Sequence, residues 1–325
     1  MENAIEQTQS RLAFLPISIF TIVMGLSGLT LAWGKAQQFL GVELNLHLPL
    51  LILTSSVFLL LLALYMSKLV LYRKYVIQEL EHPVKLSFFP AISISLLLLS
   101  AIFLSLDTDF ALPIWLAGSI LQLLFTIFVV STWMHNEHLQ VQHINPAWFI
   151  PAVGNVLVPT TGIPLGFVDL SWFFFSIGML FWAVLFTIIF YRVLFHAPID
   201  ARLMPTLYIM IAPPSLGFLA YLKLNDGVLD GFGRFLFFTG LFLTILLFSQ
   251  FKHFTRLQFT LSWWAYSFPI AAITMASFEM YEKTRNILYF YIGSVLLFIL
   301  SSIVIVLFIR TTMSALSNEI CVPDQ

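Results

Sequence analysis

The dominant feature of this sequence is a series of long apolar runs, each close to the length that a helix needs to cross a membrane. Spanning the hydrocarbon layer takes about 20 apolar residues in a helix. Runs of this order lie at about residues 14–33, 47–71, 86–106, 112–134, 147–164, 172–195, 203–222, 231–250, 262–279 and 286–310. The sequence therefore predicts an all-α integral membrane protein with ten transmembrane helices, the fifth being short and rich in Pro and Gly.

The composition agrees with a lipid environment and excludes several other classes of protein. Hydrophobic residues make up 60% of the chain and charged residues 10%, against about 25% charged residues in a soluble domain. The net charge is −1 without a block of like charges, so no nucleic-acid partner is expected. We expect one transmembrane domain over residues 1–325, with short tails at about 1–12 and 311–325.

Basic residues in the short loops predict the orientation of the chain in the inner (plasma) membrane. The end that holds both termini carries Arg11, Lys68, Arg73, Lys74, Lys85, Arg192, Arg202, Lys252, Arg256 and Arg310, whereas the other carries Lys35, Lys223, Arg234, Lys283 and Arg285. Because Lys and Arg accumulate on the cytoplasmic side, both termini are predicted to be cytoplasmic.

A repeat links the odd-numbered runs. Each has a proline after a bulky apolar residue near its cytoplasmic end, and these prolines are 54 to 74 residues apart. They are Pro16, Pro90, Pro151, Pro205 and Pro269. This spacing suits a helical hairpin with its connections, so the chain is predicted to contain five tandem hairpins that all point the same way.

Helix breakers are concentrated in the odd-numbered runs. They include Gly25, Gly28, Pro90, Pro151, Gly154, Pro213, Pro214 and Pro269. Backbone groups released at such breaks cannot face lipid unsatisfied. The odd helices are therefore predicted to form an inner ring around a central pore, with the even helices outside. Helix packing alone is the alternative role for each breaker, because small residues commonly let transmembrane helices approach.

Ionisable residues are scarce inside the runs, and Glu279 comes closest to being an exception. A buried charge usually marks a coupling site in a transporter, so its scarcity favours passive conduction over pumping. The chain also lacks a nucleotide-binding glycine loop and a hydrolase nucleophile elbow. We therefore expect neither an enzyme nor a cofactor.

Histidines gather in the loop between the fourth and fifth runs. His135 and His138 are three residues apart, and His143 and Glu137 lie close by. Two histidines at this spacing can share a metal ion if the loop is helical, but no set of cysteine or carboxylate ligands completes the site. We predict that these histidines are solvated and hold no metal.

Four longer segments carry a resemblance to a known family. They are the segment from His82 to Phe88, the segment from Asn145 to Asn155, the segment from Ile211 to Ser215 and the segment from Trp263 to Pro269. Their order and spacing resemble the tellurite-resistance/dicarboxylate transporter family, which includes bacterial TehA, plant guard-cell slow anion channels, and fungal malate and sulfite transporters.

This resemblance implies a function and a gate. It implies a homotrimer with an uncharged pore through each ten-helix protomer, occluded by a phenylalanine that matches Phe268. Trp264, one helical turn earlier, is a second constriction or a packing residue. Lys85 and Arg202 on the inside, and Lys35 and Arg234 on the outside, are candidates for positive potential at the pore mouths; topology determinants are the alternative.

The sequence therefore predicts a gated channel for small anions such as chloride or nitrate, with a link to tellurite resistance implied by the resemblance. A coupled carrier or exporter of sulfite or C4-dicarboxylates is the alternative function.

Overall fold

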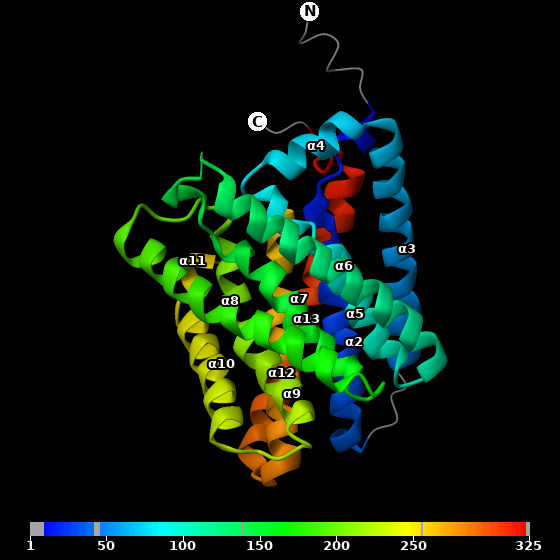
Figure 1. Ribbon diagram of the computed structural model, residues 1–325, viewed down its shortest axis with the longest axis vertical. Helices are drawn as coiled ribbons and strands as arrows, with labels where there is room; N and C mark the ends of the chain where they lie inside the picture. The colour runs from blue at the N-terminus through cyan, green and yellow to red at the C-terminus, as the bar shows by residue number, and fades with distance from the viewer. Residues whose placement is uncertain (1–9, 42–45, 138, 255, 323–325) are drawn as a thin grey trace, which may run out of the picture.

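The computed structural model describes residues 10–41, 46–137, 139–254 and 256–322, and over these ranges its regular elements are all helices (Figure 1). The α-helices are α2 (Thr21–Leu40), α3 (His47–Leu71), α4 (Arg73–Glu81), α5 (Ala91–Phe103), α6 (Thr108–His135), α7 (Phe149–Gly162), α8 (Val168–Phe195), α9 (Ala212–Leu224), α10 (Gly231–Ser249), α11 (Phe251–Phe254), α12 (Ser267–Thr284) and α13 (Ile287–Leu316).

Eight helical segments within these ranges are long and apolar enough to cross a membrane, and they fall into two classes of burial. The segments that contain α2, α5 and α9 are 78% buried by the rest of the protein, whereas those of α3, α6, α8, α10 and α13 are 28–39% buried. The second class presents rows of Leu, Ile and Phe to the outside. Such surfaces suit lipid, so the chain is a multi-pass helical membrane protein.

Two further helices, α7 and α12, are deeply buried but differ in length or composition. The helix α7 has 14 residues, and α12 has 18 residues that include Glu279, Glu282 and Lys283. Because most of their residues are covered by protein, their stability in a membrane does not depend on an apolar surface toward lipid.

The buried helices contact one another in a closed cycle, α2 to α5, α5 to α7, α7 to α9, α9 to α12 and α12 to α2. Each also contacts the more exposed helix that follows it in the chain: α3, α6, α8, α10 and α13 respectively. In Figure 1 the more exposed α3 and α10 flank this central group.

A 3₁₀ segment precedes each buried helix. These segments are η2 (Ile17–Phe20), η3 (Lys85–Phe88), η5 (Pro146–Trp148), η6 (Met204–Ile211) and η7 (Leu261–Tyr266). A proline has no N–H and clashes with the carbonyl four residues before it, but it is tolerated in the first turn of a helix. Pro151, Pro213, Pro214 and Pro269 all lie in the first turn of their α-helix. The breaks expected at these prolines are therefore 3₁₀-to-α junctions at the starts of the helices.

Several helices extend beyond their apolar runs. The first run was expected to end at residue 33, but α2 continues to Leu40 and is followed by Gly41 in the left-handed region, with φ of 63°. The helix α6 begins at Thr108 because Asp107 caps its first turn, so Pro113 lies inside an outer helix. Polar residues end an apolar run without ending a helix.

The two ends of the described chain lie together. The Arg11 guanidinium donates hydrogen bonds to the carbonyl of Ala315 in the last turn of α13, and to Asn318 and the carbonyl of Ile320 just after it. Figure 1 shows α4 at the same end of the molecule.

Candidate functional site

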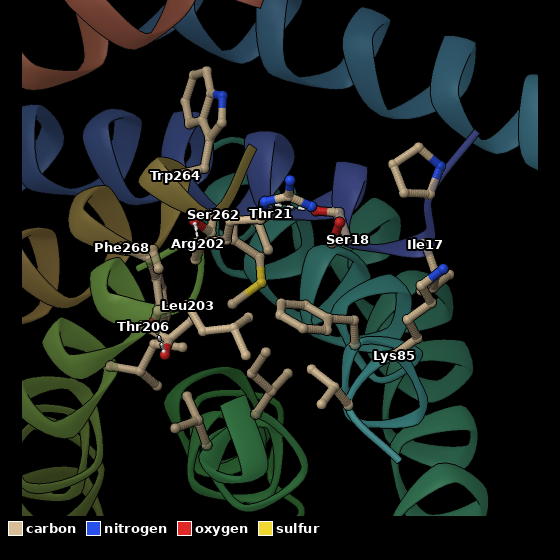
Figure 2. A pocket seen from close by; sticks show the side chains of 18 of the residues that line it. Ile17, Ser18, Thr21, Lys85, Arg202, Leu203, Thr206, Ser262, Trp264 and Phe268 are labelled. Atoms are coloured by element: carbon tan, nitrogen blue, oxygen red, sulfur yellow. Dashed lines mark hydrogen bonds between the residues drawn. The ribbon is translucent and has the colours of Figure 1, made fainter. Parts of the chain in front are cut away.

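A cavity of about 330 Å³, called the near cavity below, lies where the five buried helices begin. Each of these helices or its 3₁₀ segment contributes to the wall, for example through Met24, Phe88, Val153, Ala212 and Phe268. Figure 2 shows side chains from several of these segments, among them Thr21, Lys85 and Phe268, around one space. The prolines mark where the buried helices begin, and residues at these helix starts form the wall of the cavity.

Two basic side chains border the near cavity. Lys85 comes from η3 and Arg202 from the turn before η6. The turn is held by Asp200, whose carboxylate accepts the Arg202 backbone N–H at 2.7 Å, and by Ser262, whose hydroxyl donates to the Arg202 carbonyl. In Figure 2 the Arg202 guanidinium projects into the cavity in the direction of Ser18.

Phe268 and Trp264 both border the near cavity and are almost completely buried. Phe268 has an exposed fraction of 3%, so its ring is enclosed by protein beside the cavity. The Trp264 indole donates a hydrogen bond of 2.9 Å to the Thr311 hydroxyl on α13. Trp264 is therefore fixed by an outer helix, whereas Phe268 has no polar group to hold it.

Two glycines of α2 allow α12 to approach closely. A Cβ atom added at Gly25 would lie 2.7 Å from the Trp264 ring, and one added at Gly28 would lie 2.8 Å from the Ala271 Cβ and 3.3 Å from the Phe268 ring. Because distances below 3.0 Å essentially do not occur between real Cβ atoms and their neighbours, a larger residue would displace α12. These glycines set the position of the Phe268 ring.

A buried ion pair fixes the start of α2 beside the near cavity. The Lys68 ammonium lies 2.8 Å from the Glu79 carboxylate and also donates to the Leu15 carbonyl at 2.8 Å. Glu79 accepts further hydrogen bonds from the Tyr65 hydroxyl at 2.8 Å and from the Ile17 N–H at 3.1 Å. These bonds compensate for the burial of both charges and hold the backbone on either side of Pro16.

A second cavity, the far cavity, has a volume of about 730 Å³ and lies toward the other ends of the same five helices. Its wall includes Leu31, Leu98, Leu157, Leu216 and Met275, one residue from each helix. Both cavities therefore lie along one axis inside the cycle of buried helices.

Only a short stretch of helix separates the two cavities. On α7 the bordering residues Val153 and Leu157 are four positions apart, and Ala212 and Leu216 have the same spacing on α9. Four residues of α-helix rise about 6 Å. On α12 and α2 the spacing is wider, with six positions from Pro269 to Met275 and seven from Met24 to Leu31. The constriction between the cavities is therefore about one to two helical turns long on these four helices, and Phe268 borders its near side.

Charged residues of the far cavity are joined in a cluster. The Lys35 ammonium lies 2.6 Å from Glu279 and 2.5 Å from Glu282, and Lys283 lies 3.8 Å from Glu279. These pairs connect the end of α2 to the end of α12. Lys35 was expected to supply positive potential at this mouth, but two carboxylates balance its charge.

The comparisons with known proteins identify the family. Residues 15–312 match the family model described as "SLAC1: Voltage-dependent anion channel". The chain belongs to this family. Membership of an anion-channel family agrees with the expectation that the protein is not an enzyme.

Curated relatives from three kingdoms match over most of this chain. The Tellurite resistance protein TehA homolog of Haemophilus influenzae is 28% identical over 94% of this chain and 92% of its own length. The Guard cell S-type anion channel SLAC1 of Arabidopsis thaliana is 25% identical over 95% of this chain and 57% of its own length. Uncharacterized transporter MJ0762 of Methanocaldococcus jannaschii is 25% identical, with 96% and 98% covered.

The sequence-predicted site residues are divided between the cavity walls and the helix contacts. Trp264, Phe268, Pro269, Lys85 and Arg202 border the near cavity, and Lys35 borders the far cavity. The remaining candidates border neither: Gly25, Gly28, Pro90, Pro151, Gly154, Pro213, Pro214 and Arg234.

Gly154 illustrates a predicted pore residue that serves packing instead. A Cβ atom there would lie 2.2 Å from the carboxamide of Gln122 on α6. That carboxamide donates to the Pro151 carbonyl at 2.8 Å and accepts from the Ser93 hydroxyl at 2.7 Å. Gly154 therefore makes room for a polar contact between α5, α6 and α7.

Sequence reasoning missed the apolar residues that form most of the near wall. Met24, Ile150, Val153, Ile209 and Ala212 border the cavity, but nothing in their identity distinguishes them from lipid-facing or core residues. The proline at the start of each buried helix was the available signal, because the cavity lies within about two turns of it.

The histidine loop was expected to hold no metal. His135 contacts the Ser131 carbonyl at 2.8 Å, and His143 accepts the Gln140 N–H at 3.2 Å. His138 lies outside the described residues.

Proposed function

We propose that this protein is a gated channel for small anions, with the pathway running through the cycle of buried helices. The observation that carries the proposal is the pair of cavities toward opposite ends of the same five helices, with a short constriction between them and Phe268 at its near side. Phe268 is the gate in this proposal. An enclosed apolar ring both fills a narrow path and resists wetting, so an anion would lose water without gaining polar contacts.

In the proposed topology, a single domain crosses the membrane ten times as five tandem hairpins, with both termini in the cytoplasm. The contact between Arg11 and the end of α13 supports an even number of crossings. The buried α7 and α12 supply the two crossings that a criterion based on apolar length does not select. The excess of Lys and Arg at the near end supports its cytoplasmic location.

Two features of the near cavity favour anions. Lys85 and Arg202 border it together with Asp200 and with Glu79, whose charge Lys68 balances. The N-terminal ends of all five buried helices also lie around it. Helix N-termini carry partial positive charge because the backbone dipoles of the helix are aligned. This potential attracts anions without placing a charged side chain inside the constriction, so chloride or nitrate can pass without tight binding.

Family membership supports a proposal for the assembly and the physiological role. We propose a homotrimer with one pathway in each protomer, which light scattering of the detergent-purified protein would test. The name of the Haemophilus influenzae relative suggests a link to tellurite resistance, and the names of the plant relatives suggest anion conduction.

Recording from purified protein in planar bilayers tests this function directly. With asymmetric chloride or nitrate, we expect unitary currents that reverse near the equilibrium potential of the anion. Gradients of sulfite and malate in the same apparatus address the alternative. Saturable exchange of sulfite or malate without unitary currents would replace the channel with a coupled carrier.

A further inference from the structure

One lysine of the far cavity makes no ion pair with a carboxylate of the described residues. Lys35 and Lys283 are matched by Glu279 and Glu282, as two positive and two negative groups in one cluster. Lys223 also borders the cavity, and no carboxylate of the described residues lies within 4.0 Å of its ammonium. Lys223 therefore gives the far cavity a net positive charge.

A structural role accounts for only one of the hydrogen bonds that the Lys223 ammonium can donate. Its ammonium donates to the Thr160 carbonyl at 2.6 Å. The residue four positions after Thr160 is Pro164, which has no N–H, so this carbonyl lacks its usual helical donor. Lys223 thus caps the end of α7 with one N–H. An ammonium has three, so two are not used by Thr160.

A second donor in the same cavity is also unmatched. Gln37 borders the far cavity, and its buried amide nitrogen has no hydrogen-bond partner among the described residues. A buried N–H without an acceptor costs free energy, so such groups in native proteins usually meet a water, ion or ligand. An anion offers acceptors both to this amide and to an ammonium.

We propose that the far cavity contains an anion-binding station in which Lys223 supplies the charge and Gln37 a neutral donor. The ligand is a small monovalent anion such as chloride, bromide or nitrate, because one positive charge remains after the cluster is balanced. The inference rests on the proposed channel function and deepens it. The station concentrates anions beyond the constriction and so raises their flux when the external concentration is low.

Single-channel conductance across a range of salt concentrations tests the station. In a Phe268→Ala background that is open, Lys223→Met should lower the conductance by about 3- to 10-fold at low ionic strength. The difference should vanish near 1 M salt, where the Debye length is about 3 Å. Lys223→Arg should retain the conductance, and Gln37→Leu should lower it less than Lys223→Met. Arg234→Met is the matched control, because Arg234 is exposed and borders neither cavity.

Two results would overturn the station. The first is a folded Lys223→Met protein whose low-salt conductance equals that of its parent. The second applies if Lys223→Met does not fold because the cap of α7 is lost. In that case Lys223→Gln, which keeps a donor for the Thr160 carbonyl, replaces it. The station is overturned if Lys223→Gln and Gln37→Leu both conduct like the parent. If Phe268→Ala passes no current, the channel function has failed instead. The anomalous signal of bromide in crystals then decides the station by its presence or absence beside Lys223.

Discussion

The two ends of the bundle are built on different principles. The near cavity is the smaller, is bordered by helix starts, and is fixed by a Lys68–Glu79 pair whose side chains are 2% and 7% exposed. The far cavity is larger, and its cluster of Lys35, Glu279 and Glu282 has side chains that are 18–38% exposed. The near end therefore has a rigid shape, whereas the far end has charge that solvent and ions can reach.

Helix polarity gives a physical reason for this difference. All five buried helices start at the near cavity and end toward the far one. The near end thus receives partial positive charge from the backbone, and the far end partial negative charge. Lysines at the far end oppose that negative potential, and an anion pathway needs them there. At the near end, the backbone itself contributes positive potential.

The largest expected effect concerns the rigidity of the near end. Lys68→Met leaves Glu79 buried beside Tyr65 and Ile17 without its cation, and breaking a buried pair by removing one partner costs about 3–5 kcal/mol. Denaturant unfolding in detergent measures this loss. Lys35→Met, which breaks the exposed cluster at the far end, should cost less because water and salt screen the carboxylates that remain.

A double variant sharpens this prediction. Lys68→Met combined with Glu79→Leu removes both buried charges, so it should be more stable than Lys68→Met alone. Equal losses for Lys68→Met and Lys35→Met would show that the two ends do not differ in the way described above.

The next effect concerns conduction at the near side of the constriction. Phe268→Ala should raise the unitary current by at least about tenfold, which corresponds to a barrier lower by about 1.4 kcal/mol. Bilayer recordings measure the current. Phe278→Ala is the matched control on the same helix, because Phe278 is fully buried but borders neither cavity. That control should lose about 3–5 kcal/mol of stability without gaining current.

A folded Phe268→Ala protein with the parental current would show that the pathway closes elsewhere. Gly28 offers an independent check, since a side chain there would press on the Phe268 ring. A change of gating in Gly28→Ala without a change in Phe268→Ala would contradict the assignment of the gate.

Sequence reasoning predicted the near end better than the far end, because local signals determine the near end. Apolar runs indicated the helices, and prolines marked where the buried helices start. Those starts bring Lys85, Arg202 and Phe268 to one cavity. Each of these signals is contained in a short segment of chain, so none requires knowledge of which helices are neighbours.

The charge pairs could not be predicted in this way. Lys35 and Glu282 are 247 positions apart, and Lys68 is separated from Glu79 by the end of one helix and most of another. A lysine near the end of an apolar run reads as a topology determinant whether or not it is paired. Helix packing decides which lysine is paired with a carboxylate, and in this respect Lys35 differs from Lys223.

The smallest expected effect tests the charge balance of the far end with a single carboxylate. Glu282→Gln removes one negative charge but leaves the Lys35 pair with Glu279, at 2.6 Å, intact. In the Phe268→Ala background, the anion conductance should rise by less than about twofold at low ionic strength, because a side chain that is 38% exposed is already screened by water. The rise should disappear near 1 M salt, where the Debye length falls to about 3 Å.

Asp169→Asn is the matched control for this charge. Asp169 is an exposed carboxylate at the start of α8 that borders neither cavity, so its removal should leave the conductance unchanged. The sign of the Glu282→Gln effect carries the argument, since added positive potential helps an anion and hinders a cation. A fall in conductance would mean that the far cavity conducts cations, and equal effects of the two variants would mean that only the overall surface charge acts on the pathway.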